Sequence, residues 1–93
     1  MTDDPLIRAL RTQISGADRS ILEAFNARLE LVSRIKGRKA ELGIGFVDAD
    51  QERRLLDDLA RANRGPLSDE GLRELFGEIL DLTKREVERR DEG

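Results

Sequence analysis

The sequence predicts an all-α protein with three helices, of which the first is very long and the other two are shorter. Charged residues make up 40% and hydrophobic residues 38% of the 93 positions, and the chain has only two prolines. A high share of Leu, Ala, Arg and Glu favours helices, and apolar residues recur at every third or fourth position. This regular spacing argues against the disorder that so many charges would otherwise favour. The length suits a single small domain, 1–93.

The composition also argues against several classes of function. The net charge of −3 offers no general attraction for nucleic acid or an anionic membrane. The absence of Cys and His removes the thiolate nucleophile and the commonest general base and metal ligand, so neither a metal nor a cofactor is expected. The segment Met1–Pro5 lacks the features of a signal peptide, and no apolar run is long enough to span a membrane. We therefore expect a soluble cytoplasmic protein without nucleic-acid or membrane partners.

The first predicted helix runs from about Pro5 to Leu42. The acidic residues Asp3 and Asp4 beside Pro5 form a start signal, and no strong breaker precedes Gly43. Arg28 interrupts the otherwise apolar seam of this helix with a guanidinium, and burying that charge is costly unless an anion meets it. The seam comprises Ile7, Leu10, Ile14, Ala17, Ile21, Ala24, Arg28, Leu31, Ile35, Arg38 and Leu42.

The length of this helix predicts a dimer. The helix would extend over about 55 Å at the usual rise per residue, whereas a compact domain of this size has a radius of gyration of about 12 Å. One chain therefore cannot cover its own apolar seam, and we expect an intertwined homodimer.

Two shorter helices are predicted after a connector at 43–47, whose apolar residues we expect to tuck inward. Asp48 is the expected N-cap of the second helix, which should end near Asn63 before a Gly-Pro stop. Ser68 is the expected N-cap of the third helix. The segment from Lys84 to Gly93 is nearly all charged, and we expect it to fray.

Two cations share one face of the first predicted helix. The spacing of Arg28 and Lys39 places them within about 20° on one face and about 16 Å apart along the axis. Arg11 lies about 25 Å from Arg28 along the axis, so only the partner's Arg11, in an antiparallel dimer, can join the same small site. A structural interpretation stays open, in which the cations pair with acidic residues such as Asp18, Glu30, Glu41 or Glu52.

The order and spacing of these residues resemble those of the all-helical chorismate mutases, over roughly Leu6 to Glu86. No single motif is specific, whereas the ordered set is. The set comprises Leu10-Arg11-x-x-Ile14-Ser15-x-x-Asp18, Ile21-Leu22, Arg28-x-Glu30-Leu31-Val32, Ile35-x-x-x-Lys39, Asp48-x-x-x-Glu52, Asn63-x-Gly65-Pro66-Leu67 and Leu75-Phe76-x-Glu78-Ile79.

The resemblance implies an isomerase of aromatic amino acid biosynthesis that converts chorismate to prephenate in a homodimer. It implies two sites, each lined by both chains, in which Arg28 and the partner's Arg11 bind the substrate carboxylates. It also implies that Lys39 contacts the ether oxygen, and that Glu52 and the backbone at Asp48 hold the ring hydroxyl. Thr83 stands where the family has a hydroxyl residue that meets a carboxylate.

Two positions depart from the family pattern. Gln51 replaces an Arg at the start of the second helix, and Val87 replaces a Gln or Glu that lies near the ether oxygen. Arg54, one turn after Gln51, is near enough to lean toward the site, whereas Arg53 points elsewhere. Three interpretations stay open: a weak mutase, an enzyme for a related substrate such as an isochorismate-pyruvate lyase, and a helical dimer that regulates another shikimate-pathway enzyme.

Overall fold

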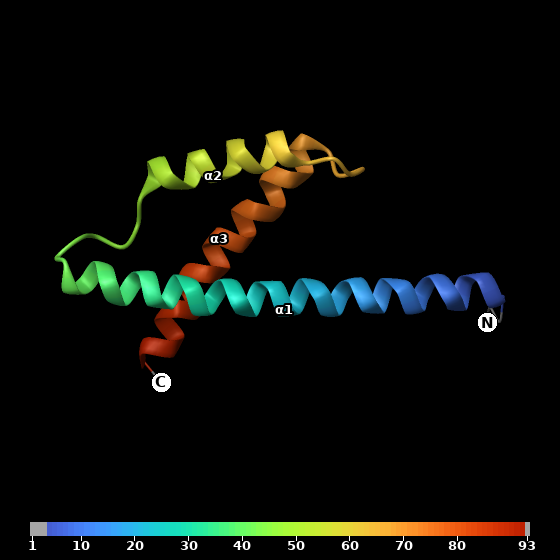
Figure 1. The fold of residues 1–93 in the computed structure, drawn as a ribbon, viewed down its shortest axis with the longest axis horizontal. Helices are drawn as coiled ribbons and strands as arrows, with labels where there is room; N and C mark the ends of the chain where they lie inside the picture. The colour runs from blue at the N-terminus through green and yellow to red at the C-terminus, as the bar shows by residue number, and fades with distance from the viewer. Residues whose placement is uncertain (1–3, 93) are drawn as a thin grey trace. The chain divides into compact units, whose positions relative to one another are not determined.

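A computed structural model describes residues 4–92 of the chain as three helices, α1 (Pro5–Glu41), α2 (Ala49–Ala62) and α3 (Asp69–Glu92) (Figure 1). One long and two shorter helices confirm the predicted all-α class. The chain divides into two compact units, Met1–Leu31 and Val32–Gly93. The second unit contains the end of α1, the connector, α2 and α3.

The ends of α1 follow from local sequence. The backbone N–H of Ile7 donates to Asp4 Oδ1 at 2.9 Å, which caps the helix directly before Pro5. At the other end Gly43 adopts a φ of 71°, a left-handed conformation that favours glycine. The N–H groups of Gly43 and Ile44 donate to the carbonyls of Ala40 and Lys39 at 3.2 and 2.8 Å, which is a Schellman motif. The predicted end at Gly43 is confirmed, whereas Asp3 lies outside the described residues.

The connector after α1 differs from the prediction. Ile44 and Val47 are 54% and 61% exposed, so the expectation that its apolar residues tuck inward is wrong for these two. Phe46 is half-buried, and the Lys36 ammonium lies 5.5 Å from the centre of its ring. A cation on α1 therefore contacts the middle of the connector.

The helices α2 and α3 pack against each other and begin at the predicted caps. Asp48 Oδ1 accepts a hydrogen bond from the Gln51 N–H at 3.1 Å. Ser68 Oγ accepts one from the Gly71 N–H at 2.9 Å. Leu72, only 4% exposed, is one of the two buried hydrophobic residues among those described.

A guanidinium on α3 joins the two shorter helices. Arg73 contacts Asp69 on its own helix at 3.1 Å and Asp57 on α2 at 3.3 Å. The hydrogen bond with Asp69, and then that with Asp57, raise the pKa of Arg73 above its ordinary value. All three groups lie at the surface, so this bridge contributes little to the free energy of unfolding.

The C-terminal part of α3 is anchored, and the predicted fraying from Lys84 is wrong for the residues described. Val87 is only 1% exposed, the most buried residue of the chain described. Asp91 pairs with Lys36 on α1 at 2.5 Å, and Arg90 donates to Ser33 Oγ at 3.2 Å. The charged residues of this segment thus hold it against the end of α1, while Val87 supplies the apolar contact.

The described part of the N-terminal unit consists of α1 up to Leu31, so this unit contains a single helix. No residue of α1 is buried. A lone helix in water gains little stability from its backbone, so its apolar face needs another surface. Its large exposed hydrophobic residues are Leu6, Leu10, Ile14, Ile21, Leu22 and Leu31, which are 47–66% exposed.

The anchoring of α3 predicts a clear effect of one substitution. Val87→Ala should lower the free energy of unfolding by about 2 kcal/mol, because it removes buried methyl groups and leaves a cavity. Val47→Ala, at a 61% exposed position, should change it by less than about 0.5 kcal/mol. Urea denaturation at one fixed protein concentration measures both. If Val87→Ala changes the free energy of unfolding as little as Val47→Ala does, the end of α3 is frayed.

Candidate active site

The Val32–Gly93 unit contains a cavity of about 110 Å³ between the end of α1, the connector, α2 and α3. Each of these segments contributes to its wall, so the site depends on the packing of the unit. The lining residues are Val32, Lys39, Phe46, Val47, Asp48, Gln51, Glu52, Leu80, Thr83 and Lys84. Five of the eight sequence-predicted site residues are therefore brought together: Lys39, Asp48, Gln51, Glu52 and Thr83.

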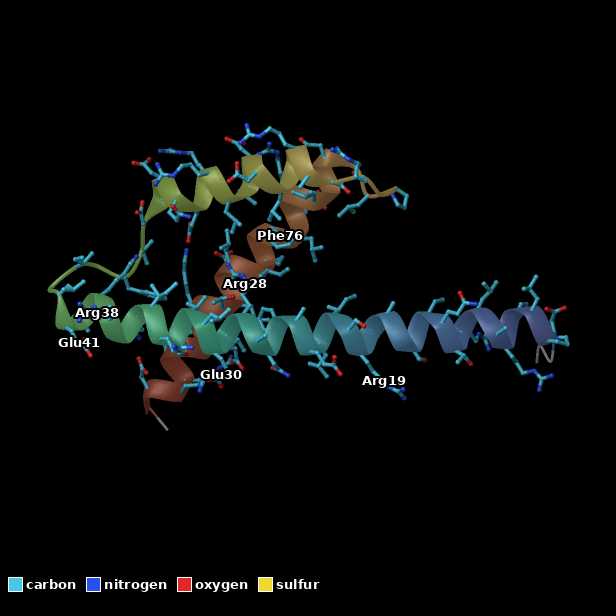
Figure 2. All side chains as sticks on the ribbon, viewed as in Figure 1. Arg19, Arg28, Glu30, Arg38, Glu41 and Phe76 are labelled. Atoms are coloured by element: carbon cyan, nitrogen blue, oxygen red, sulfur yellow. The ribbon has the colours of Figure 1, made fainter. Side chains whose placement is uncertain are left out.

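Lys39 is a half-buried cation of the cavity wall. Its ammonium donates to the backbone carbonyl of Phe46 at 3.1 Å, which fixes the side chain against the connector. An ammonium carries three donors, so two remain for a ligand. Glu41, one of the acids considered as a partner, pairs with Arg38 at 2.9 Å instead (Figure 2). No ion pair within residues 4–92 involves Lys39.

Asp48 and Gln51 form the part of the wall at the start of α2. The Asp48 carboxylate caps the helix, where the helix dipole favours a negative charge. The Gln51 side-chain oxygen accepts a hydrogen bond from Arg54 at 3.3 Å, which leaves its amide N–H groups as donors. Arg54 thus contacts Gln51, but it is not among the residues that line the cavity. Arg53 pairs with Asp50.

Glu52 forms an ion pair across the cavity wall with Lys84, a residue that the sequence analysis did not select. Lys84 Nζ lies 2.8 Å from Glu52 Oε1, and the two side chains are 33% and 29% exposed. The missed signal was helical spacing: Lys84 follows Leu80 by one turn and therefore shares its face. Assigning the segment after Thr83 to a frayed tail concealed this relation.

Thr83 and Val87 lie one turn apart on α3 but differ in their relation to the cavity. Thr83 lines it, is only 3% exposed, and its hydroxyl donates to the Ile79 carbonyl at 2.6 Å. Because a hydroxyl has a single proton, this bond must break before Thr83 donates to a ligand. Val87 is buried and is not among the lining residues.

The positive and negative charges of the cavity wall balance, and Lys84 is itself engaged in the ion pair with Glu52. Two ammonium groups, Lys39 and Lys84, stand beside two carboxylates, of which Asp48 is engaged as a cap and Glu52 in an ion pair. Pockets for whole small molecules usually measure about 300 Å³ or more, and this cavity has about 110 Å³. The cavity of this unit is therefore smaller than a typical pocket for a whole small molecule.

Comparisons with known proteins identify the family of this chain. The sequence pattern described as chorismate mutase type II matches residues 10–88. The chain belongs to the chorismate mutase type II family. This confirms the resemblance inferred from the motifs.

Solved structures of this family share the fold. A chorismate mutase from Thermus thermophilus, in its form II, superposes with a TM-score of 0.85 at 36% sequence identity. That match covers 89% of this chain and 94% of the other. Form I of the same protein gives a TM-score of 0.81 at 36% identity and covers 83% and 96% of the two chains.

A curated relative is much longer than this chain. The bifunctional chorismate mutase/prephenate dehydratase of Pseudomonas aeruginosa is 31% identical over 85 residues. The match covers 86% of this chain and 23% of the relative. The similarity is thus to one part of a two-activity protein.

The remaining predicted residues of this chorismate mutase family member lie outside the cavity lining. Arg11 and Arg28 lie on α1 in the Met1–Leu31 unit (Figure 2 labels Arg28). Their roles in a substrate site stay predictions. Among the described residues, no group of three metal-ligating side chains comes together, and none of their helices is long and apolar enough to cross a bilayer.

The cap at the start of α2 predicts that the side chain of Asp48 stabilises the fold. Asp48→Ala should lower the free energy of unfolding by about 1 kcal/mol, because the Gln51 N–H loses its acceptor. Asp48→Ser, which keeps a capping oxygen, should lose less than half of that. Denaturant unfolding compares them, and equal losses in the two variants would contradict a capping role.

Proposed function

We propose that this protein is a chorismate mutase, which rearranges chorismate to prephenate in a site completed by a second copy of the chain. The observation that carries the proposal is the cavity of the Val32–Gly93 unit, where Lys39 is held by the connector and Glu52 is paired. Membership of the type II family supports the same reaction.

The reaction suits a chain without His or Cys. The rearrangement is pericyclic and needs no nucleophile, proton transfer or metal. It needs the flexible dianion held in its compact conformer, which is a matter of orientation. It also needs positive charge where the ether oxygen becomes negative, and the anchored Lys39 ammonium is suited to that task.

The carboxylates of the substrate require further cations. Guanidinium groups bind carboxylates at two points, which suits Arg11 and Arg28. We propose that Arg28 acts with the Lys39 cavity and that the partner's Arg11 completes the site. The small volume of the cavity supports this, because a whole chorismate needs more contacts than one unit offers.

The homodimer itself is supported by the exposed apolar residues of α1. The face that includes Leu10, Ile14 and Ile21 is uncovered in the N-terminal unit. Burial of a large apolar side chain contributes about 1.5–3 kcal/mol, so covering this face with the same face of a second copy would stabilise both. A further shikimate-pathway enzyme as a partner remains a weaker proposal, supported by the two activities named for the Pseudomonas relative.

Mixing two inactive variants tests the activity and the shared site together. Arg11→Ala and Lys39→Met should each lower kcat/KM for chorismate by roughly 100-fold or more, because each removes a cation that faces the substrate. After joint unfolding and refolding, half of the dimers are mixed and carry one intact site, so activity should recover to about a quarter of normal.

The absorbance of chorismate follows its loss, and prephenate is identified as the product. Refolded single variants are the control. No turnover by the unsubstituted protein would overturn the activity, whereas turnover without recovery on mixing would overturn only the shared site. Formation of salicylate from isochorismate, without prephenate from chorismate, would reassign the protein as a lyase.

A further inference from the structure

The Glu52–Lys84 pair is the one ion pair among the described residues whose two members both line the cavity. It joins α2 to α3 across the wall, at 2.8 Å, with both side chains about one-third exposed. By contrast, the side chains of the Arg38–Glu41 pair are 68% and 67% exposed. An ion pair in the wall bears directly on any charged ligand.

The charge balance of the wall depends on this pair. Lys39 and Lys84 supply two positive charges, and Asp48 and Glu52 supply two negative ones. Gln51 adds no charge, and Arg54, which contacts it, does not line the cavity. Without Lys84 the carboxylates outnumber the ammonium groups, and the wall would repel an anion.

We propose that Lys84 is a positioning residue of the substrate site, which acts through Glu52. It neutralises the Glu52 carboxylate toward an incoming dianion and holds Oε1, so that the other oxygen, Oε2, accepts the hydrogen bond of the ligand hydroxyl. This inference rests on the proposed function, since a dianion that carries a hydroxyl is the ligand class it describes.

The place of Lys84 fits this role better than a purely structural one. A solvated ion pair between two helices contributes little to stability, whereas the same pair beside a bound dianion shapes the field that the ligand meets. Leu80, one turn earlier on α3, also lines the cavity, so the same face of this helix carries both residues along the wall.

Charge-changing variants test the inference. Lys84→Met should raise KM for chorismate about 10-fold or more with a smaller change in kcat, because the unpaired Glu52 opposes binding of the dianion. Lys84→Arg, which keeps the charge, should stay within about threefold of normal. Adding Glu52→Gln to Lys84→Met should lower KM again, because the unpaired negative charge is removed. A purely structural role for Lys84 predicts no such recovery.

Arg85→Met is the matched control, since it removes one positive charge from the neighbouring exposed position of α3, outside the cavity lining. It should leave KM unchanged. Circular dichroism verifies that each variant is folded, and calorimetric titration with a non-reacting bicyclic dianion that mimics the transition state measures a dissociation constant independently of turnover. We expect calorimetry to rank the variants in the same order as their KM values.

The two proposals fail in different ways. If the unsubstituted protein turns chorismate over and Lys84→Met behaves like Arg85→Met, the inference about Lys84 is overturned and the proposed function stands. If the unsubstituted protein neither binds nor converts chorismate, both are overturned. Binding without turnover, weakened by Lys84→Met and recovered by the double variant, would overturn the activity and support the role of Lys84.

Discussion

An uncovered apolar face on a long helix is the constraint on which this structure depends. The described part of α1 buries no residue, although Leu10, Ile14 and Ile21 recur on the face that a core would occupy. Such a helix does not persist in water by backbone hydrogen bonds alone. The face has to be covered, and a second copy of the chain offers an apolar surface of the same length and pattern.

The cavity of the other unit is small and mixed in charge. The Val32–Gly93 unit supplies an anchored ammonium at Lys39, a capped carboxylate at Asp48 and the Glu52–Lys84 pair. These groups suit the ether and hydroxyl oxygens of a substrate better than its carboxylates. We propose that the guanidinium groups of Arg11 and Arg28, on another part of α1, bind the carboxylates and reach the site through dimerisation, which would couple folding, assembly and catalysis.

Features set by neighbouring residues could be predicted from the sequence, and features set by distant contacts could not. The caps Asp48 and Ser68 and the stop at Gly43 depend on hydrogen bonds within a few residues, and all three are confirmed. The exposure of Val47 depends on which segments pack together, and its prediction was wrong.

The C-terminal end of α3, which borders the site, also depends on distant contacts and was therefore mispredicted. Its charged sequence resembles a solvated tail, but Asp91 finds Lys36 on α1, and Val87 is buried. The motif order placed Lys39 and Glu52 in one site, and the structure brings them together. The motif order could not include Lys84, because Lys84 becomes part of the cavity wall only when α3 continues beyond Thr83.

The most direct test of the central claim is the mass of the folded protein in solution. Sedimentation equilibrium, with helicity followed by circular dichroism over the same dilution series, measures whether folding requires a second copy. The account predicts a species of twice the 10.5 kDa chain mass at micromolar concentration, with helicity that falls as the dimer dissociates. A fully helical species of 10.5 kDa that persists on dilution would contradict it.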